Sequence, residues 1–159
     1  MALIYESKHF LVEAPDAPLV GRTDGGHITI HPKIRVLNLQ QLTIEMAIEL
    51  MRLIMVVGEA MSTVLNKNGV DVGRINYQDN GNWGVFKSEG PYQHFHLYGR
   101  AKSGVQQEYG QACYFPHKAD APEFYQNLEP LSKKDISDLN LEIIHLFASD
   151  KYANSNWKL

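Results

Sequence analysis

The sequence predicts an α+β fold: an antiparallel sheet of about five strands with one long helix and a C-terminal helix. Three observations predict it. Short alternating segments separated by turns fill the first part of the chain, an apolar stripe with helical spacing runs from residue 44 to 65, and a second stripe follows residue 132. Short connections between strands favour antiparallel pairing, and 159 residues is the size of one domain.

The first two strands are predicted at residues 4–5 and 9–13, with a turn between them. Residues 14–26 contain two prolines and three glycines, and this composition predicts a loop. The N-terminal third of the chain is therefore expected to consist of strands and turns.

The next strand is predicted at residues 26–31, where apolar and polar side chains alternate. Ile28 and Ile30 share one face, and His27 and His31 share the other, because successive side chains of a strand point to opposite sides. The proline that follows is expected to end this strand.

Residues 43–69 contain the clearest helix. Thr43 is a suitable N-cap, and Glu45 places a negative charge in the first turn, where the helix dipole favours it. Asn68 and Gly69 supply a stop. The stripe that we expect to face the core consists of Ile44, Ala47, Ile48, Met51, Ile54, Met55, Gly58, Met61 and Leu65. The helix is expected to lie across the sheet.

A second helix is predicted after Ser132, which forms a capping-box pattern with Asp135. Its apolar face consists of Ile136, Leu139, Ile143, Leu146 and Phe147. The other predicted elements are a strand at residues 72–78, a turn at 79–82, a loop at 83–91, and strands at 91–100 and 111–115.

The composition excludes several classes of protein. Fifteen Lys and Arg against eighteen Asp and Glu give a net charge of −3, and without a dense basic run we expect no nucleic-acid partner. The longest apolar stretch, residues 50–61, is interrupted by Arg52 and Glu59 and is shorter than the ~20 residues of a membrane span. The N-terminus does not have the pattern of a signal peptide, so we expect a cytoplasmic protein without a membrane partner.

Imidazole is the side-chain chemistry that the sequence offers most. The chain has seven histidines and one cysteine. Cys113 alone can form neither an intramolecular disulfide nor a Cys-based zinc site, and we expect it to be a small core residue.

The most informative segment is residues 91–100, which reads Pro-Tyr-Gln-His-Phe-His-Leu-Tyr-Gly-Arg. In a strand its alternate residues face opposite sides, so its phenylalanine and leucine are expected to face the helix. Tyr92, His94, His96 and Tyr98 then share the other face, with the two imidazoles roughly 6–7 Å apart.

This pair of histidines has three interpretations. It can be two surface side chains on a half-exposed sheet. It can be a pair of metal ligands completed by His27 or His31, although no carboxylate partner is evident. It can also be catalytic, because a neutral imidazole attacks phosphorus to form a covalent intermediate while a second imidazole binds a phosphate oxygen or protonates the leaving group. The residues alone leave these three interpretations open.

The order of the elements resembles the histidine triad (HIT) superfamily of nucleotide hydrolases and transferases. Residues 26–32 read Gly-His-Ile-Thr-Ile-His-Pro, a long amphipathic helix follows, and a His-x-His strand lies between a proline and an arginine. The resemblance covers roughly residues 4–100. It implies one HIT-like domain over residues 1–159, with a core of about 4–116 and a C-terminal helix of about 132–149. It also implies a homodimer whose two sheets join into one.

One histidine of the family's triad is missing here, so two registers are possible. Either Tyr98 replaces the third triad histidine or Tyr92 replaces the first. We favour the second register, because it aligns Pro91 and Arg100 with the family's proline and arginine without a gap. It also resembles a bacterial branch of the family whose first triad residue is glutamine. In this register Tyr92 is expected to position the nucleotide.

The resemblance then implies a role for each remaining site residue. His94 takes the position of the family's nucleophile, and His96 takes the third triad position, which contacts the phosphate oxygens. His27 matches the family's glycine-histidine position near the phosphate, and Gln78 falls where the family has an amide that contacts the nucleotide. Asn76 shares the strand face of Gln78. The alternatives are a strand-end histidine for His27 and polar cover of the sheet for the two amides.

The function implied is hydrolysis or transfer at the α-phosphorus of a nucleotide through a covalent nucleotidyl-histidine. Dinucleoside polyphosphates and nucleoside phosphoramidates are the expected substrates. No cofactor is expected to be required, although a divalent cation can accompany a polyphosphate substrate. Two alternatives remain: a HIT-fold protein that binds nucleotides without turnover because its triad is incomplete, and a His-ligated metalloprotein.

Overall fold

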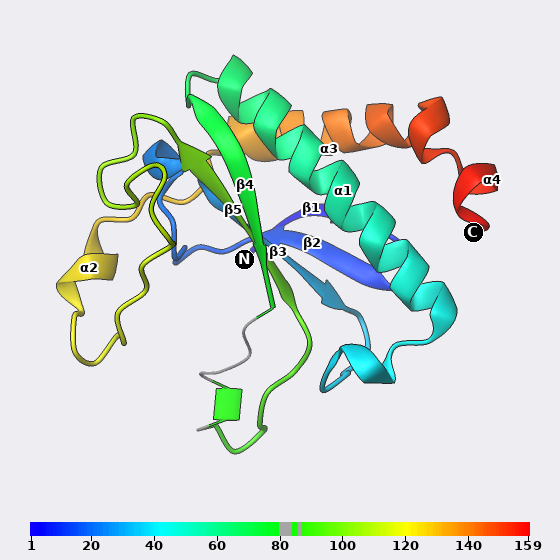
Figure 1. The fold of residues 1–159 in the computed structure, drawn as a ribbon, viewed down its shortest axis with the longest axis horizontal. Helices are drawn as coiled ribbons and strands as arrows, with labels where there is room; N and C mark the ends of the chain where they lie inside the picture. The colour runs from blue at the N-terminus through cyan, green and yellow to red at the C-terminus, as the bar shows by residue number, and fades with distance from the viewer. Residues whose placement is uncertain (80–83, 86) are drawn as a thin grey trace.

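The computed structural model describes residues 1–79, 84–85 and 87–159. Within this part of the chain, five strands form one sheet in the order β1-β2-β3-β5-β4, and every neighbouring pair is antiparallel (Figure 1). The strands are β1 (Ala2–Glu6), β2 (Phe10–Ala14), β3 (His27–Pro32), β4 (Val72–Gln78) and β5 (Phe95–Ala101). The predicted α+β class is confirmed.

Two long helices pack with this sheet. α1 (Ile44–Lys67) begins after Thr43, whose hydroxyl accepts a hydrogen bond from the Met46 amide, as the predicted N-cap requires. α3 (Lys133–Phe147) begins with the predicted capping box. α1 runs diagonally across the sheet (Figure 1), and α3 packs against α1 and β1. Two single-turn helices, α2 (Glu123–Gln126) and α4 (Asn154–Trp157), complete the described α-helices. No helix in the described part of the chain is long and apolar enough to cross a membrane.

The core lies between the sheet and the two long helices. Ile28 and Ile30 of β3 and Leu97 of β5 are completely buried in it, as the predicted alternation requires. Because side chains alternate along these strands, the histidines of β3 and β5 lie on the other face of the sheet.

The apolar stripe predicted for α1 is only partly correct. Its last three residues, from Gly58 onward, are buried, but Ile44, Met51 and Met55 are exposed. The helix face that packs on the sheet is instead rotated toward residues such as Leu53 and Val57, which are buried. An apolar surface therefore remains exposed on the outer side of α1.

The strand predicted at residues 111–115 is wrong. The backbone of Tyr114 pairs with the side chain of Gln107, whose oxygen accepts from the Tyr114 N–H at 3.0 Å and whose amide donates to its carbonyl at 2.8 Å. A buried side-chain amide thus replaces a neighbouring strand. The turn predicted at residues 79–82 and the loop predicted at 83–91 lie partly outside the described residues.

β5 is shorter than the strand predicted at residues 91–100. It begins at Phe95, which pairs with Ile30, and β3 ends two residues later at a proline that has no N–H to donate. Before Phe95 the chain instead bonds to the segment after β3, where the Gln93 N–H donates to the Val36 carbonyl at 2.6 Å.

At the end of the loop predicted at residues 14–26, the backbone of Gly25 lies very close to the backbone of β5. Gly25 has a φ of 124°, and a side chain there would collide with the backbone of Gly99. Only glycine can occupy this position. The close contact between Gly25 and Gly99 fixes the start of β3 and therefore the position of His27.

Candidate functional site

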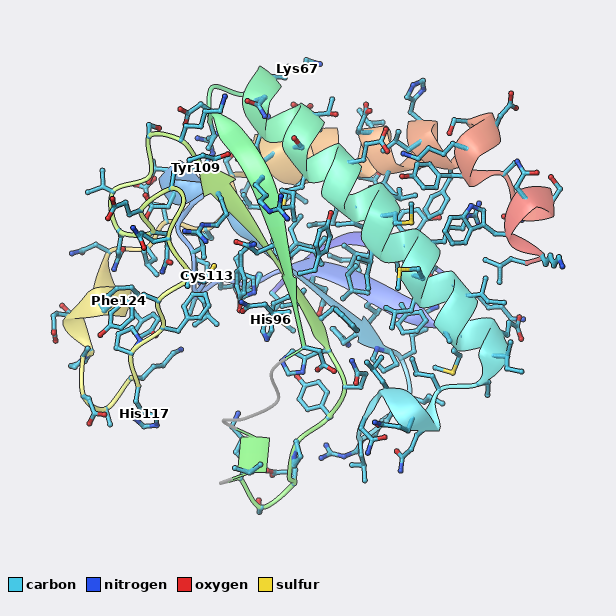
Figure 2. The ribbon with its side chains drawn as sticks, viewed as in Figure 1. Lys67, His96, Tyr109, Cys113, His117 and Phe124 are labelled. Atoms are coloured by element: carbon cyan, nitrogen blue, oxygen red, sulfur yellow. The ribbon has the colours of Figure 1, made fainter. Side chains whose placement is uncertain are left out.

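Three histidines gather on the sheet face opposite the core. In the β3–β5 pair His27 lies opposite Tyr98 and Thr29 lies opposite His96, and paired residues share a face. Figure 2 labels His96. His94 comes just before β5, and its ring centroid is 4.6 Å from that of His96. The structure therefore brings together the three histidines that the sequence predicts for the site.

His27 and His96 are buried, at 4% and 9% exposure. Burial, assisted by the neighbouring His94, lowers the pKa of His96 to about 4. Burial, together with the charges of His96 and His94, also lowers the pKa of His27 well below its ordinary value. Both rings are therefore neutral at pH 7, because a buried imidazole is harder to charge than one in water.

A chain of hydrogen bonds determines which nitrogen of each buried ring carries the proton. The Leu19 N–H donates to Nδ1 of His27 at 3.1 Å, so the proton of this neutral ring is on Nε2. That Nε2–H donates to Nδ1 of His96 at 2.9 Å. The proton of His96 is therefore on its Nε2, and His96 presents an N–H donor.

His94 has the opposite tautomer. Its Nδ1 lies 2.9 Å from the carbonyl oxygen of Tyr92, which only accepts hydrogen bonds, so in the neutral form of the ring the proton is on Nδ1. Nε2 of His94 then has a free lone pair, which is the nucleophilic form of imidazole. Two neighbouring imidazoles thus present one lone pair and one N–H.

Tyr92 lies at one end of this row of rings. Its ring stacks on that of His94 with centroids 4.7 Å apart, and the guanidinium of Arg35 lies 5.8 Å from its centroid. Arg35 also donates to the backbone carbonyls of Glu89 and Gly90. Arg35 therefore links the approach to β5 with the Tyr92 ring beside His94.

The two predicted amides lie on β4, next to β5. Gln78 is paired with His96 and Asn76 is paired with Tyr98, so both residues belong to the histidine face. The side-chain oxygen of Asn76 accepts a hydrogen bond from Arg100 at 2.9 Å. Asn76 is thus engaged within the protein, and Gln78 is the amide nearer to the histidines along the strand.

Sequence reasoning missed the surroundings of Tyr98. The Tyr98 ring is completely buried, stacks on His96 with centroids 5.4 Å apart and contacts the Phe115 ring at 4.9 Å. Cys113, expected in the core, is half-buried on this face and accepts a hydrogen bond from Arg100 at 3.2 Å. No local pattern signals these contacts, because the chain returns to the sheet here as a loop.

His31, considered above as a third metal ligand, pairs instead with Glu13. Its Nε2 lies 2.6 Å from the carboxylate, and both residues lie on the histidine face of the sheet. This pair was not predicted. Across residues 1–79, 84–85 and 87–159, no group of three or more His, Cys, Asp or Glu is placed to hold a metal ion.

Comparison with solved structures finds several proteins of similar fold. A HIT-like protein involved in cell-cycle regulation from Bartonella henselae matches with a TM-score of 0.56 at 13% identity, covering 89% of this chain and 85% of that one. A hypothetical histidine triad nucleotide-binding protein from Sulfolobus tokodaii has a TM-score of 0.56 at 16% identity, with 91% and 85% covered. A HIT family member from Bacillus subtilis has a TM-score of 0.51 at 19% identity, with 94% and 89% covered. No protein-family model and no curated protein matches the sequence.

At these identities the likeness concerns the fold, and an activity has to be argued from the site. The similar structures agree with the predicted resemblance in fold class, and the matched regions span most of each chain. This protein therefore has the fold of the histidine triad superfamily.

Proposed function

We propose that this protein hydrolyses or transfers nucleotides at the α-phosphorus, with His94 as the nucleophile. The observation that carries the proposal is the pair of opposite tautomers: His94 offers a lone pair on Nε2, and neutral His96 beside it offers an N–H. A nucleophile next to a neutral donor is the arrangement that attack on a phosphoryl group requires.

In the proposed reaction, Nε2 of His94 forms a bond to phosphorus as the bond to the leaving group breaks, and the leaving group takes up a proton from solvent. The oxygen of a water molecule then bonds to phosphorus as the bond between phosphorus and Nε2 breaks, and one proton of that water returns to solvent. The products are a nucleoside monophosphate and free His94. The Nε2–H of His96 donates to a phosphoryl oxygen. His27 acts through His96 as a positioning residue, because both of its ring nitrogens already have partners.

The proposal is tested with a panel of dinucleoside polyphosphates and nucleoside phosphoramidates. We expect release of a nucleoside monophosphate from at least one member of the panel, without added metal for the phosphoramidates. Binding of AMP without turnover of any member would instead support a nucleotide-binding protein. Among the described residues, no group of three or more His, Cys, Asp or Glu could serve as ligands for the metalloprotein alternative.

Tyr92 is proposed to position the nucleotide rather than to transfer protons. A phenol has an ordinary pKa near ~10, so at pH 7 it is a neutral hydrogen-bond donor. We expect Tyr92→Phe to lower kcat/KM about fivefold, the effect of one neutral hydrogen bond of ~1 kcal/mol. Tyr92→His should be tolerated. A thousandfold loss in Tyr92→Phe would assign proton transfer to this hydroxyl and contradict the positioning role.

We also propose a homodimer that uses the exposed apolar side of α1 and the open edge strand β4. Met51 is 55% exposed on α1, and β4 is the last strand of the sheet. We expect the protein to elute as a dimer in size-exclusion chromatography with light scattering and Met51→Glu to elute as a monomer. Leu141→Glu on α3, where the side chain is 63% exposed, is the matched control and should stay dimeric. A monomeric wild-type protein at micromolar concentration would contradict the arrangement.

A further inference from the structure

The segment that follows β5 carries a group of aromatic side chains. Phe115 contacts Tyr98, which stacks on His96, so ring packing is continuous from the histidines into this segment. Further along, Tyr114 packs on Phe124 with centroids 5.6 Å apart. In Figure 2, Phe124 lies out beside the sheet, well separated from His96. We call residues 113–125 the aromatic segment.

The aromatic segment is held in place by buried polar side chains. Gln107, which is 2% exposed, bonds both backbone groups of Tyr114, and so fixes the residue next to Phe115. The buried carboxylate of Asp24 accepts hydrogen bonds from the backbone N–H groups of residues 105–107, which precede the aromatic segment in the chain. Phe115 therefore has a set position before any ligand binds, which reduces the entropy cost of a contact with one.

The geometry of displacement at phosphorus determines which part of a substrate lies next to the aromatic segment. The attacking and leaving atoms lie on opposite sides of the phosphorus. The rings form a row that begins at Tyr92 and continues through His94, His96 and Tyr98 to Phe115, so His96, Tyr98 and Phe115 all lie on the same side of His94. A phosphorus attacked by His94 and held by His96 therefore directs its leaving group toward the Tyr98 and Phe115 end of the row.

We propose that Phe115 is a specificity-determining residue that stacks on a planar aromatic ring in the leaving group. Tyr98 is completely buried, so Phe115, which is half-buried, is the ring of this pair that a ligand can reach. Aromatic rings gain from offset stacking beyond the burial of apolar area, and a saturated ring of similar size does not. This inference rests on the proposed function and narrows its substrates to nucleotides whose α-phosphorus carries an aromatic leaving group.

The test compares two adenosine 5′-phosphoramidates, one of 2-phenylethylamine and one of 2-cyclohexylethylamine. The two leaving amines have the same carbon skeleton and differ in whether the ring is planar. We expect the wild-type protein to favour the phenyl compound in kcat/KM by about fivefold, the usual gain of an aromatic pair. In Phe115→Leu this ratio should fall to near one. Tyr109→Leu is the matched control and should keep the wild-type ratio, because Tyr109 packs on Gly73 at the far end of β4.

The Kd values of the same two compounds are also measured by calorimetry with the His94→Ala variant, in which turnover is expected to be absent. A fivefold ratio of Kd values that Phe115→Leu removes supports the inference, even if the wild-type protein turns over neither compound. A ratio of Kd values near one in the His94→Ala variant that keeps Phe115 would overturn the inference. A ratio that stays the same when Phe115→Leu is added would also overturn it. Turnover of both compounds at equal rates would overturn it and leave the proposed function standing.

Discussion

Replacing His94 with Ala is expected to abolish turnover, by about 10⁴-fold or more, because the variant has no atom that can form the bond to phosphorus. The fold should remain intact, since His94 precedes β5 and is only partly buried. The measurement is kcat/KM on the best substrate of the panel, with circular dichroism and thermal unfolding to verify the fold. His145→Ala, which changes an exposed histidine of α3, is the matched control and should retain activity.

The covalent step has its own readout. In a rapid-quench experiment with a nucleotide labelled at the α-phosphorus, we expect the label on the peptide that contains His94. The opposite register, with Tyr98 in place of the third histidine, makes His96 the nucleophile instead. A fully active His94→Ala together with an inactive His96→Ala would support that register and reject ours.

Local patterns were sufficient to predict α1, α3 and β4. Their caps and their alternation depend on residues within one element, as with Thr43 and the amide three residues after it. The pairing of Tyr114 with Gln107 could not be predicted in this way. The apolar run at residues 111–115 is compatible with a strand. No neighbouring residue shows that a side-chain amide takes the place of a partner strand. The exposed residues of the α1 stripe have a similar cause, since apolar spacing alone does not show which apolar side chains of a helix are buried in the core.

The candidate site was predictable only at the level of which residues come together. The two-residue period was enough to expect His94 and His96 side by side, even though β5 begins between them. The tautomers were not predictable. They depend on the N–H of Leu19, which lies in a loop, and on the carbonyl of Tyr92, which lies before β5 begins.

The neutral, buried histidines also predict that the folded state loses stability in mild acid. In the unfolded chain a histidine has a pKa of ~6.5, whereas in the folded protein the pKa of His96 is lowered to about 4 and that of His27 is lowered as well. Between these values the unfolded state binds protons that the folded state does not. The free energy of unfolding is therefore fully maintained above pH ~6.5 and falls as the pH drops toward 4.

His96 alone should lower the free energy of unfolding by about 2 kcal/mol between pH 7 and pH 5, and His27 should add to this. Urea unfolding at the two pH values measures the change. In His96→Gln the side chain no longer titrates, so the difference between pH 7 and pH 5 should shrink by about that amount, whatever the variant's stability at pH 7. An unchanged difference in His96→Gln would mean that His96 takes up its proton in the folded state as readily as in water, which would also remove the neutral N–H donor on which the proposed chemistry depends.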